Sequence, residues 1–534
     1  MIIDLNETNE TPEFLCDLCI IGTGAAGLAL ASEMLNTPFN IILIESGGLE
    51  HEPKTQALYN ADISGLPHTG TMEGRFRIHG GSTTKWAGQA LPLMPIDFER
   101  RDWIPHSGWP VSFDDLTPYY RRASRFLLVD KMNFDSDLLT YLKTHPPAFD
   151  PSKILYHFSK WSPTPNIREN HLPSIKESDH CTLLLHANVT KIELDASLKQ
   201  ARQVEVHSLL GHRAIVKAKN FVICAGGIES ARLLLSNNRQ QPNGIGNDHD
   251  LVGRFFQDHP SAVIGWLKTS NPKQAQRLFN VFHKRKLKYS VRCTASQEWQ
   301  RQQQTLNMST GVTFVADNSA LQDLKDVYRA MRHHSFDMTT LLKLFRAVGR
   351  SAAILSPAMH YVLRGRSYTP GAKLRIGLTS EQEPNPESRI LLSERADALG
   401  TPLSNIRWKL TELTRYSMQQ FATALRDEFQ LSNIGKIEFE PWLFDNSSAW
   451  MEHVTDQFHH IGTTRMHDSP RYGVVDRNCR VHGIENLYIG SSAVFPTSGH
   501  SNPTLTIIAL CIRLADRLKH ELGFISDLKK DDVP

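Results

Sequence analysis

Cysteine is scarce in this chain, which has only seven cysteines among 534 residues, an odd number scattered along the sequence. Such a set does not suit a disulfide framework, so a reducing compartment is the simpler inference. Cys16 and Cys19 have a spacing found in metal and redox sites, but no second pair accompanies them. The alternation of a strand explains their spacing better, and we expect no metal site.

Strong net charge and long apolar runs are also missing from the sequence. The formal net charge of +3 is too small to indicate a nucleic-acid partner or acidic substrates. No uninterrupted apolar run is long enough to cross a bilayer, so we expect no transmembrane segment. The first residues, MIIDLNETNETPE, are polar and acidic and do not have the pattern of a signal peptide. The expected location is therefore cytoplasmic.

Residues 14–48 carry the strongest local signal. Leu18–Ile21 is a short apolar run, typical of a strand buried in a parallel sheet. Gly22, Gly24 and Gly27 follow with the G-x-G-x-x-G spacing and lead into a segment of helical composition. The first glycine permits a tight turn, and the second lets a pyrophosphate approach the backbone. The third allows the helix to pack closely on the strand.

A second apolar run, Ile41–Ile44, ends at Glu45, which is followed by Ser46. A carboxylate at this position can accept hydrogen bonds from an adenosine ribose, and we include both residues in the expected site. The N-terminus of the intervening helix presents free N–H groups and a partial positive charge to phosphates. A tight turn alone would explain the glycines. Strand, glycines, helix, strand and acid together predict a dinucleotide site.

Two further stretches of small residues are expected to approach the same ligand. Residues 80–84 read GGSTT, a loop that can bring backbone N–H groups close to a flat or anionic group. Residues 221–227 read FVICAGG, a second buried strand that ends in a glycine turn. The expected contacts are Gly81, Ser82, Thr84, Ala225 and Gly226. No second full G-x-G-x-x-G is present, so we expect the hydride to come from an organic substrate and not from a nicotinamide.

Residues 80–84 and the segment 109–120, WPVSFDDLTPYY, resemble the glucose-methanol-choline (GMC) family of flavoproteins. The sequence is most similar to the branch that contains bacterial sugar and polyol dehydrogenases and pyranose oxidases. The resemblance implies FAD as the cofactor and places the backbone of Val189 at the adenine edge, although an ordinary core valine explains that residue equally well. In some members of the branch, a histidine at the position of Lys85 is bonded covalently to the flavin. Lysine at this position implies that FAD is held non-covalently.

Dehydrogenases of this branch often bind an iron–sulfur cluster through a tight group of cysteines near residues 130–170. This chain has only Cys181 nearby, and a cluster needs several thiolates, so we expect none. The segment 130–170 is rich in proline and aromatic residues and has no clear period. We therefore expect it to form loops of a substrate domain.

The expected catalytic residues lie near the C-terminus. Pro503 suits the first turn of an apolar helix over residues 507–518, whose N-terminus would face the flavin in the resembled fold. His500 and Asn502 lie two residues apart in the extended approach to that helix, where both side chains can point toward one cavity. Histidine is suited to removing an alcohol proton and asparagine to orienting the oxygen, and the resemblance implies that they form the family's catalytic His/Asn pair. The expected cofactor contacts here are Gly490, Ser491, Asn502, Pro503 and Thr504.

The expected fold is α/β, with an FAD-binding Rossmann-like domain of GMC type and an α+β substrate-binding domain. The FAD-binding domain is expected to be discontinuous, over residues 1–90, 181–260 and 456–534. The substrate-binding domain is expected over residues 91–180 and 261–455.

The expected reaction is oxidation of a CH–OH group of a sugar, glycoside, polyol or other alcohol to a carbonyl. His500 would take the hydroxyl proton while hydride passes to flavin N5, and O2 or another acceptor would then reoxidise the flavin. His459 or His460 would border the site, although a buried hydrogen-bonded histidine would look the same in the sequence. Two alternatives stay open: a non-redox lyase on the same scaffold, and a flavoprotein subunit that delivers electrons to a partner subunit.

Overall fold

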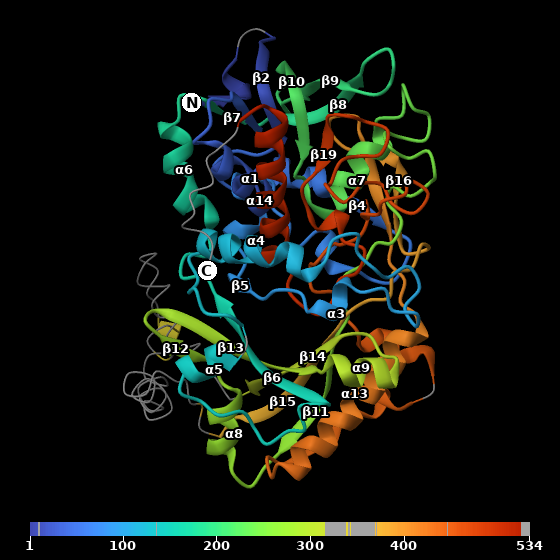
Figure 1. The fold of residues 1–534 in the computed structure, drawn as a ribbon. Helices are drawn as coiled ribbons and strands as arrows, with labels where there is room; N and C mark the ends of the chain where they lie inside the picture. Colours follow the sequence, from blue (N-terminus) through green and yellow to red (C-terminus); the bar gives the residue numbers. More distant parts are fainter. Residues whose placement is uncertain are drawn as a thin grey trace.

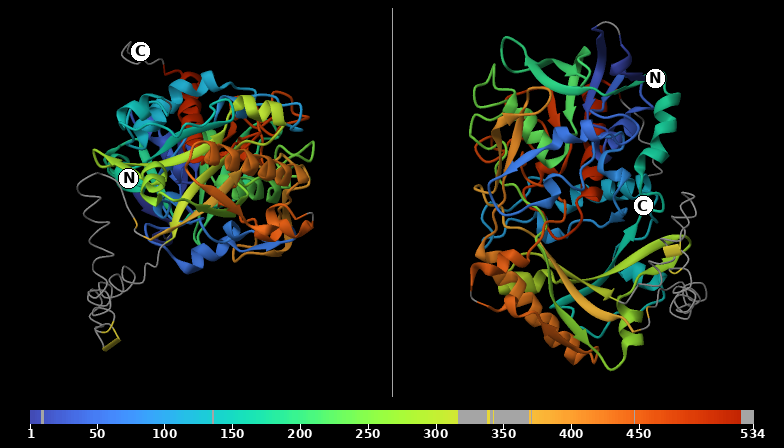
Figure 2. Two further views of the ribbon diagram at one scale, coloured as in Figure 1. Left: turned by 90° about the horizontal axis from the view of Figure 1, so that it is seen from below. Right: turned by 180° about the vertical axis from the view of Figure 1, so that it is seen from behind.

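The computed structural model describes residues 1–8, 11–134, 136–315, 371–445 and 447–524, together with four isolated positions. Three sheets organise these residues. The first sheet and its helices occupy the upper part of Figure 1, and the second sheet occupies the lower part. The view from behind in Figure 2 shows the same arrangement.

The first sheet is mostly parallel and contains strands from both ends of the chain. Its order is β1-β7-β3-β2-β10-β9-β8, and β19 pairs with β10. The bounds are β1 (Ile2–Asp4), β2 (Glu13–Ile21), β3 (Ile41–Ile44), β7 (Cys181–Leu185), β8 (Asn188–Leu194), β9 (Ala201–His207), β10 (Arg213–Ile223) and β19 (Leu487–Ile489). Strand β2 lies between β3 and β10, parallel to both, which explains why the run Leu18–Ile21 is wholly apolar and buried.

Among the helices of the upper part, α14 packs against α1 and α4 (Figure 1). The bounds are α1 (Ala25–Met34), α2 (Pro53–Gln56), α3 (Pro95–Phe98), α4 (Phe113–Phe126), α6 (Ile167–Glu177), α7 (Gly226–Ser236) and α14 (Thr504–Glu521). The expected helix after the glycine turn and the expected C-terminal helix are thus confirmed. In the part of the chain that the structure describes, no helix has the length and apolar character needed to cross a membrane.

The second sheet is antiparallel, with the order β18-β11-β15-β14-β13-β6-β5 and with β12 paired to β13. Its strands are β5 (Gln89–Ala90), β6 (Ile154–Trp161), β11 (Ser261–Lys268), β12 (Phe282–Lys284), β13 (Leu287–Ala295), β14 (Met308–Val315), β15 (Lys373–Ser380) and β18 (Lys436–Phe439). The helices of this part are α5 (Ser136–Tyr141), α8 (Pro272–Phe279), α9 (Gln297–Gln303) and α13 (Glu412–Leu431). Helix α13 packs on the sheet because one face of it, including Phe421, Leu425 and Phe429, is buried.

A third, three-stranded sheet has the order β16-β17-β4, with β16 (Arg389–Ala396), β17 (Pro402–Arg407) and β4 (Ala61–Ile63). It joins a strand from the expected FAD-binding domain to two from the expected substrate-binding domain. The α/β fold class is confirmed, whereas the domain boundaries remain a prediction.

Two expectations about local structure need correction. Residues 183–194 read LLLHANVTKIEL, a composition from which we expect one strand, but the chain turns at His186, where φ is +53°, and forms the two strands β7 and β8. The His186 ring lies 2.8 Å from Asp4 and 2.9 Å from Glu52, which holds this turn in place. The segment 130–170 is not all loop, because it contains α5 and β6. The buried alternation of Ile154, Tyr156 and Phe158 in β6 is a strand signal that the proline-rich surroundings obscured.

Candidate active site

A cavity of about 700 Å3 lies between the glycine turn of the first sheet and the start of α14. Gly22 and Gly24 line it beside α1, and Asn502 and Pro503 line it where α14 begins. Most of the expected contacts face this cavity: Gly22, Gly24, Glu45, Ser46, Gly81, Ser82, Val189, Ala225, Gly226, Ser491, Asn502, Pro503 and Thr504. The expected residues outside its lining are Gly27, Thr84, Gly490 and His500.

The three fingerprint glycines have different environments. Gly22 has φ of +103°, and a Cβ on it would lie 2.6 Å from the carbonyl oxygen of Cys224. A Cβ on Gly27 would lie only 1.9 Å from the carbonyl oxygen of Gly22, so this residue is needed for packing and not for ligand contact. A Cβ on Gly24 would meet no atom within 4 Å, because this backbone opens onto the cavity. No side chain caps α1 at Gly24, and its first N–H groups stay free for an anion.

Glu45 connects the end of β3 to the glycine turn. Its carboxylate accepts hydrogen bonds from the backbone N–H of Thr23 at 3.2 Å and of Gly47 at 3.0 Å. The Ser46 hydroxyl donates to the same carboxylate at 3.2 Å. The side chain therefore supports the turn and lines the cavity at the same time, while its contact with a ribose remains a prediction.

The other small-residue turns complete this end of the cavity. Gly226 begins α7 with φ of +77°, and a Cβ on it would meet no atom within 4 Å. The loop Gly81–Thr84 packs on the glycine turn, since a Cβ on Gly81 would lie 2.9 Å from Cα of Gly24. The Thr84 hydroxyl donates back to the Gly81 carbonyl, and this internal hydrogen bond explains why Thr84 does not line the cavity. Gly490 packs instead against the thiols of Cys224 and Cys511, each 3.1 Å from where its Cβ would lie.

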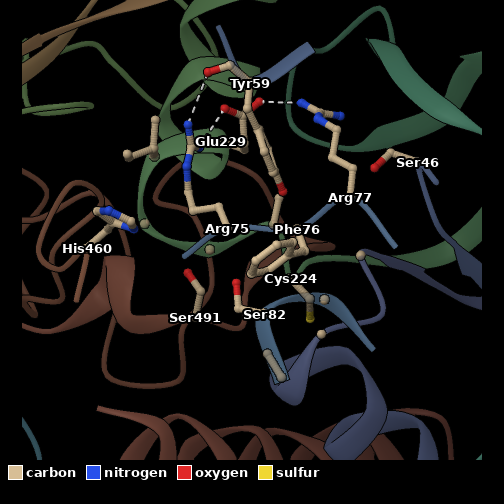
Figure 3. Close-up of a pocket in the computed structure, with 18 of the residues that line it drawn as sticks. Ser46, Tyr59, Arg75, Phe76, Arg77, Ser82, Cys224, Glu229, His460 and Ser491 are labelled. Atoms are coloured by element: carbon tan, nitrogen blue, oxygen red, sulfur yellow. Dashed lines mark hydrogen bonds and ion pairs between the residues drawn. The ribbon is translucent and has the colours of Figure 1, made fainter. Parts of the chain in front are cut away.

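One wall of the cavity carries a charged cluster that the sequence analysis did not identify (Figure 3). Arg75 and Arg77 both pair with Glu229, at 3.0 Å and 2.8 Å, and their guanidinium groups lie over the ring of Tyr59. Burial raises the pKa of Glu229, but the arginines outweigh it and bring the pKa to about 2. The paired arginines in the stretch RFR, just before the GGSTT loop, are the signal that could have indicated this cluster.

At the far end of the cavity, Asn502 meets a histidine that is not His500. The amide Nδ2 of Asn502 lies 3.2 Å from Nε2 of His459, and both residues line the cavity. Burial, with a smaller effect of His259, lowers the pKa of His459 to about 3 although Asp258 acts in the opposite direction. The imidazole is therefore neutral at pH 7 and able to accept a proton.

His500 lies in a separate buried network. Its Nδ1 is 3.1 Å from Oδ1 of Asn307, and its Nε2 is 3.2 Å from the hydroxyl of Thr294. Both ring nitrogens thus have partners in the second sheet and the loop before β14. Burial lowers the pKa of His500 well below its ordinary value. The two-residue spacing of His500 and Asn502 does not bring both side chains to the cavity.

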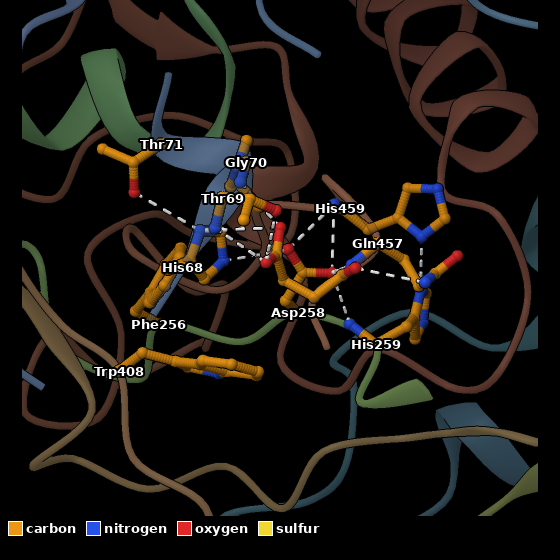
Figure 4. Close-up of polar contacts among 12 residues, drawn as sticks. His68, Thr69, Gly70, Thr71, Phe256, Asp258, His259, Trp408, Gln457 and His459 are labelled. Carbon is orange, nitrogen blue, oxygen red and sulfur yellow. Dashed lines mark hydrogen bonds and ion pairs between the residues drawn. The ribbon is translucent and has the colours of Figure 1, made fainter. Parts of the chain in front are cut away.

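Asp258 anchors the segment that carries His459 (Figure 4). Its carboxylate accepts hydrogen bonds from the backbone N–H of His259 at 2.6 Å, Gln457 at 3.0 Å and His459 at 3.0 Å. Nε2 of His68 lies 3.1 Å from the same group. His68, Asp258 and His460 each place a ligand-type atom within 4.8 Å of the others, but these hydrogen bonds satisfy the carboxylate without a metal. We assign the cluster a structural role.

The lining fits FAD. Two of its buried polar atoms, Nε of Arg77 and Nε2 of His460, have no hydrogen-bond partner among the residues that the structure describes. Buried polar atoms are normally satisfied, so a bound ligand would complete these two. The free N-termini of α1 and α7 suit a pyrophosphate, and the start of α14 suits a flavin ring that gains negative charge.

Fold and cavity together define a dinucleotide-binding flavoprotein. Residues 384–511 match the family model described as GMC oxidoreductase. This match and the named dehydrogenases and oxidases similar to the chain confirm the expected resemblance to the GMC oxidoreductases and the expected class of enzyme.

The chain is similar over nearly its full length to proteins with named activities. It is 24% identical to the fructose dehydrogenase large subunit of Gluconobacter japonicus, over 96% of this chain and 99% of that protein. It is 24% identical to the paromamine 6'-oxidase of Streptomyces fradiae, over 95% of this chain and 92% of that protein. Among solved structures, a formate oxidase variant of Aspergillus oryzae RIB40 superposes with a TM-score of 0.57 at 15% identity, over 96% of this chain and 99% of that chain. This superposition supports the shared fold.

Proposed function

We propose that this chain oxidises the CH–OH group of a sugar, glycoside, polyol or other alcohol to a carbonyl, with FAD as the hydride acceptor. The observation that carries the proposal is the His459–Asn502 pair at the cavity wall where α14 begins. Names of relatives such as fructose dehydrogenase large subunit and paromamine 6'-oxidase support the substrate class. A partner subunit as the electron acceptor is part of the proposal, because the first of these names denotes one subunit of a larger enzyme.

His459 replaces His500 as the proposed general base. A base must reach the proton that it removes, and His459 lines the cavity whereas His500 does not. Asn502, 3.2 Å from His459, is placed to donate its amide N–H to the same substrate oxygen. Arg292 adds positive charge near His459, which favours the developing alkoxide.

The proposed reaction balances as follows. The substrate O–H bond breaks and its proton passes to Nε2 of His459. The C–H bond breaks and its hydrogen leaves with both electrons, which FAD accepts when bound. The carbon–oxygen bond becomes a carbonyl, and Asn502 holds the oxygen while its charge develops.

Anaerobic stopped-flow reduction of the flavin by a panel of alcohols, sugars and glycosides tests the proposal. His459→Gln should slow flavin reduction by about 10²–10⁴-fold while FAD stays bound, as is typical of losing a general base. Asn502→Ala should slow it by about 10²–10³-fold. His500→Gln is the matched control and should reduce at close to the wild-type rate. A slow His500→Gln beside a normal His459→Gln would restore His500 as the base, and turnover of an alcohol without flavin bleaching would favour a lyase.

We also propose that FAD is held non-covalently. Lys85 lines the cavity at the position where some related enzymes have a covalently bonded histidine. Acid precipitation of the holoenzyme should therefore leave a yellow supernatant that contains intact FAD. A yellow pellet with flavin attached to a peptide would refute the proposal.

A further inference from the structure

Two stretches of chain far apart in the sequence run side by side next to the cavity. Residues 257–261 and 455–461 are antiparallel, with bridges between Gln257 and Ile461 and between Ser261 and Thr455. Between these bridges the carboxylate of Asp258 accepts the backbone N–H of His459. The backbone of His459 is thus fixed on both sides, and the side chain of His259 lies beside that of His459 with ring centroids 4.9 Å apart.

A continuous chain of hydrogen bonds passes through these two rings. Nε2 of His259 lies 3.3 Å from the carbonyl oxygen of Ser498, and Nδ1 of His259 lies 2.7 Å from Nδ1 of His459. Nε2 of His459 then faces the amide of Asn502 at 3.2 Å. The rings of His259 and His459 and the backbone around Asp258 are drawn in Figure 4.

The chemistry of these groups allows one assignment of the protons. A carbonyl oxygen can only accept, so Nε2 of His259 carries a hydrogen and donates it to Ser498. In a neutral imidazole the other nitrogen is then bare, so Nδ1 of His259 accepts from Nδ1–H of His459. His459 therefore has its lone pair on Nε2, the nitrogen on the side of Asn502 and the cavity.

This assignment of protons requires the imidazoles of His259 and His459 to be neutral. Burial lowers the pKa of His259 and that of His459. The charged groups that act on His459 are Asp258, which raises its pKa, and Arg292, which lowers it together with His259. Burial dominates, and both rings are neutral near pH 7.

We propose that His259 is a positioning residue that fixes the tautomer of His459, so that a bare Nε2 faces the substrate hydroxyl. The inference rests on the proposed role of His459 as the general base. The Ser498 carbonyl fixes the tautomer of His259, and His259 in turn fixes that of His459. His259 cannot carry a proton away from His459, because the Ser498 carbonyl cannot accept one. The proton that His459 receives must leave through Nε2, on the side of the cavity.

The tautomer can be observed directly by neutron crystallography of the deuterium-exchanged holoenzyme near pH 7. We expect a deuteron on Nδ1 of His459 and on Nε2 of His259, and none on Nε2 of His459. A deuteron on Nε2 of His459 would overturn the proposal. This measurement does not depend on the substrate, so it fails or succeeds separately from the proposed alcohol oxidation.

A pair of variants tests the functional consequence. His259→Leu removes both hydrogen-bonding atoms and should lower the limiting rate of flavin reduction by about 10- to 100-fold, the range found when the partner that orients a metal-bound histidine is removed. FAD content and the substrate concentration for half-maximal rate should stay close to wild type. His259→Gln offers one acceptor and one donor and should recover most of the rate.

The pH dependence of flavin reduction distinguishes a changed tautomer of His459 from a general loss of structure in the variants. In the wild type and in His259→Gln, reduction should fall only well below pH 6.5, because the pKa of His459 is low. In His259→Leu that acidic limb should move. A His259→Leu enzyme with the wild-type rate and limb, or a His259→Gln enzyme as slow as His259→Leu, would overturn the proposal.

Discussion

At the scale of single residues, the site contains, within the described part of the chain, a backbone position without protein neighbours and polar atoms without hydrogen-bond partners. Gly24 shows this most clearly, because a Cβ there would contact no protein atom and would point into space that the ligand is expected to fill. The orphaned Nε of Arg77 and Nε2 of His460 have the same meaning for polar atoms. The packing of the protein does not explain the open position at Gly24 or these unpaired polar atoms. A bound dinucleotide would fill the space and supply the missing hydrogen-bond partners.

Gly24→Ala should therefore weaken FAD binding without disturbing the fold. A methyl group at the phosphate approach should cost about 10- to 100-fold in FAD affinity, which corresponds to the usual 1–3 kcal/mol of overpacking. Gly311→Ala on β14 is the matched control, because a Cβ there also meets no atom within 4 Å but lies outside the cavity. Reconstitution of both apoproteins with FAD, followed by flavin fluorescence, makes the comparison. Equal affinities would place the pyrophosphate elsewhere.

At the scale of elements, the joint between β2 and α1 is held by contact of backbone with backbone. Gly27 sits in the first turns of α1 and faces the carbonyl of Gly22 at the end of β2. A similar joint connects residues 257–261 with 455–461, where Asp258 satisfies N–H groups that the flanking bridges leave unpaired. The first joint positions Gly24 and the second positions His459, and both residues line the cavity.

Gly27→Ala tests the first joint. The added Cβ would lie 1.9 Å from a backbone oxygen, so the helix must move away from the strand. We expect a loss of at least about 1–3 kcal/mol in the free energy of unfolding of the apoprotein, as for other overpacked sites. Urea unfolding of the apoproteins of the wild type, Gly24→Ala and Gly27→Ala would measure this. Wild-type stability of Gly27→Ala would contradict the packing role assigned to this glycine.

At the scale of the whole molecule, a buried polar layer lies between the first and second sheets. Arg101 pairs with Glu381, and Asn307 joins Asp97, at 2.7 Å, to His500. Burial and the nearby Glu381 raise the pKa of Asp97 to about 7. Ten histidines in the described chain have pKa values lowered chiefly by burial: His79, His106, His157, His171, His207, His259, His459, His460, His467 and His500.

These histidines should make the protein sensitive to mild acid. Each has a pKa near 6.5 when unfolded and a lower one when folded, for example about 4 for His79. The unfolded chain therefore binds more protons between these values, and stability present above pH 6.5 is lost as the pH falls. For His79 the loss at pH 5 is on the order of 2 kcal/mol. Asp97 and His186, whose pKa values are raised, act in the opposite direction but are fewer.

Thermal unfolding of the holoenzyme at pH 7.5, 6.5, 5.5 and 5.0 measures the net effect of these groups on stability. The Tm should fall steadily below pH 6.5, and it should do so above the range in which most carboxylates titrate. A Tm that is constant or rises toward pH 5 would contradict the prediction that these histidines remain neutral in the folded state.

The sequence by itself determined the first sheet and its ligand turn, because the signals there are local. The apolar run Leu18–Ile21, the glycine spacing and the strand Ile41–Ile44 each depend on residues close in the chain, and the structure has strands and a helix at these positions. It also indicated most of the cavity lining, since turns at the ends of parallel strands meet at one edge.

The tertiary structure alone decided which histidine faces Asn502. His500 is two residues from Asn502 in the sequence, yet its ring nitrogens lie next to Thr294 in the second sheet and Asn307 in the loop before β14. His459 reaches Asn502 because residues 455–461 are held against 257–261 through Asp258. Both placements follow from contacts between distant segments, and spacing along one segment carries no information about which buried partners a side chain will find.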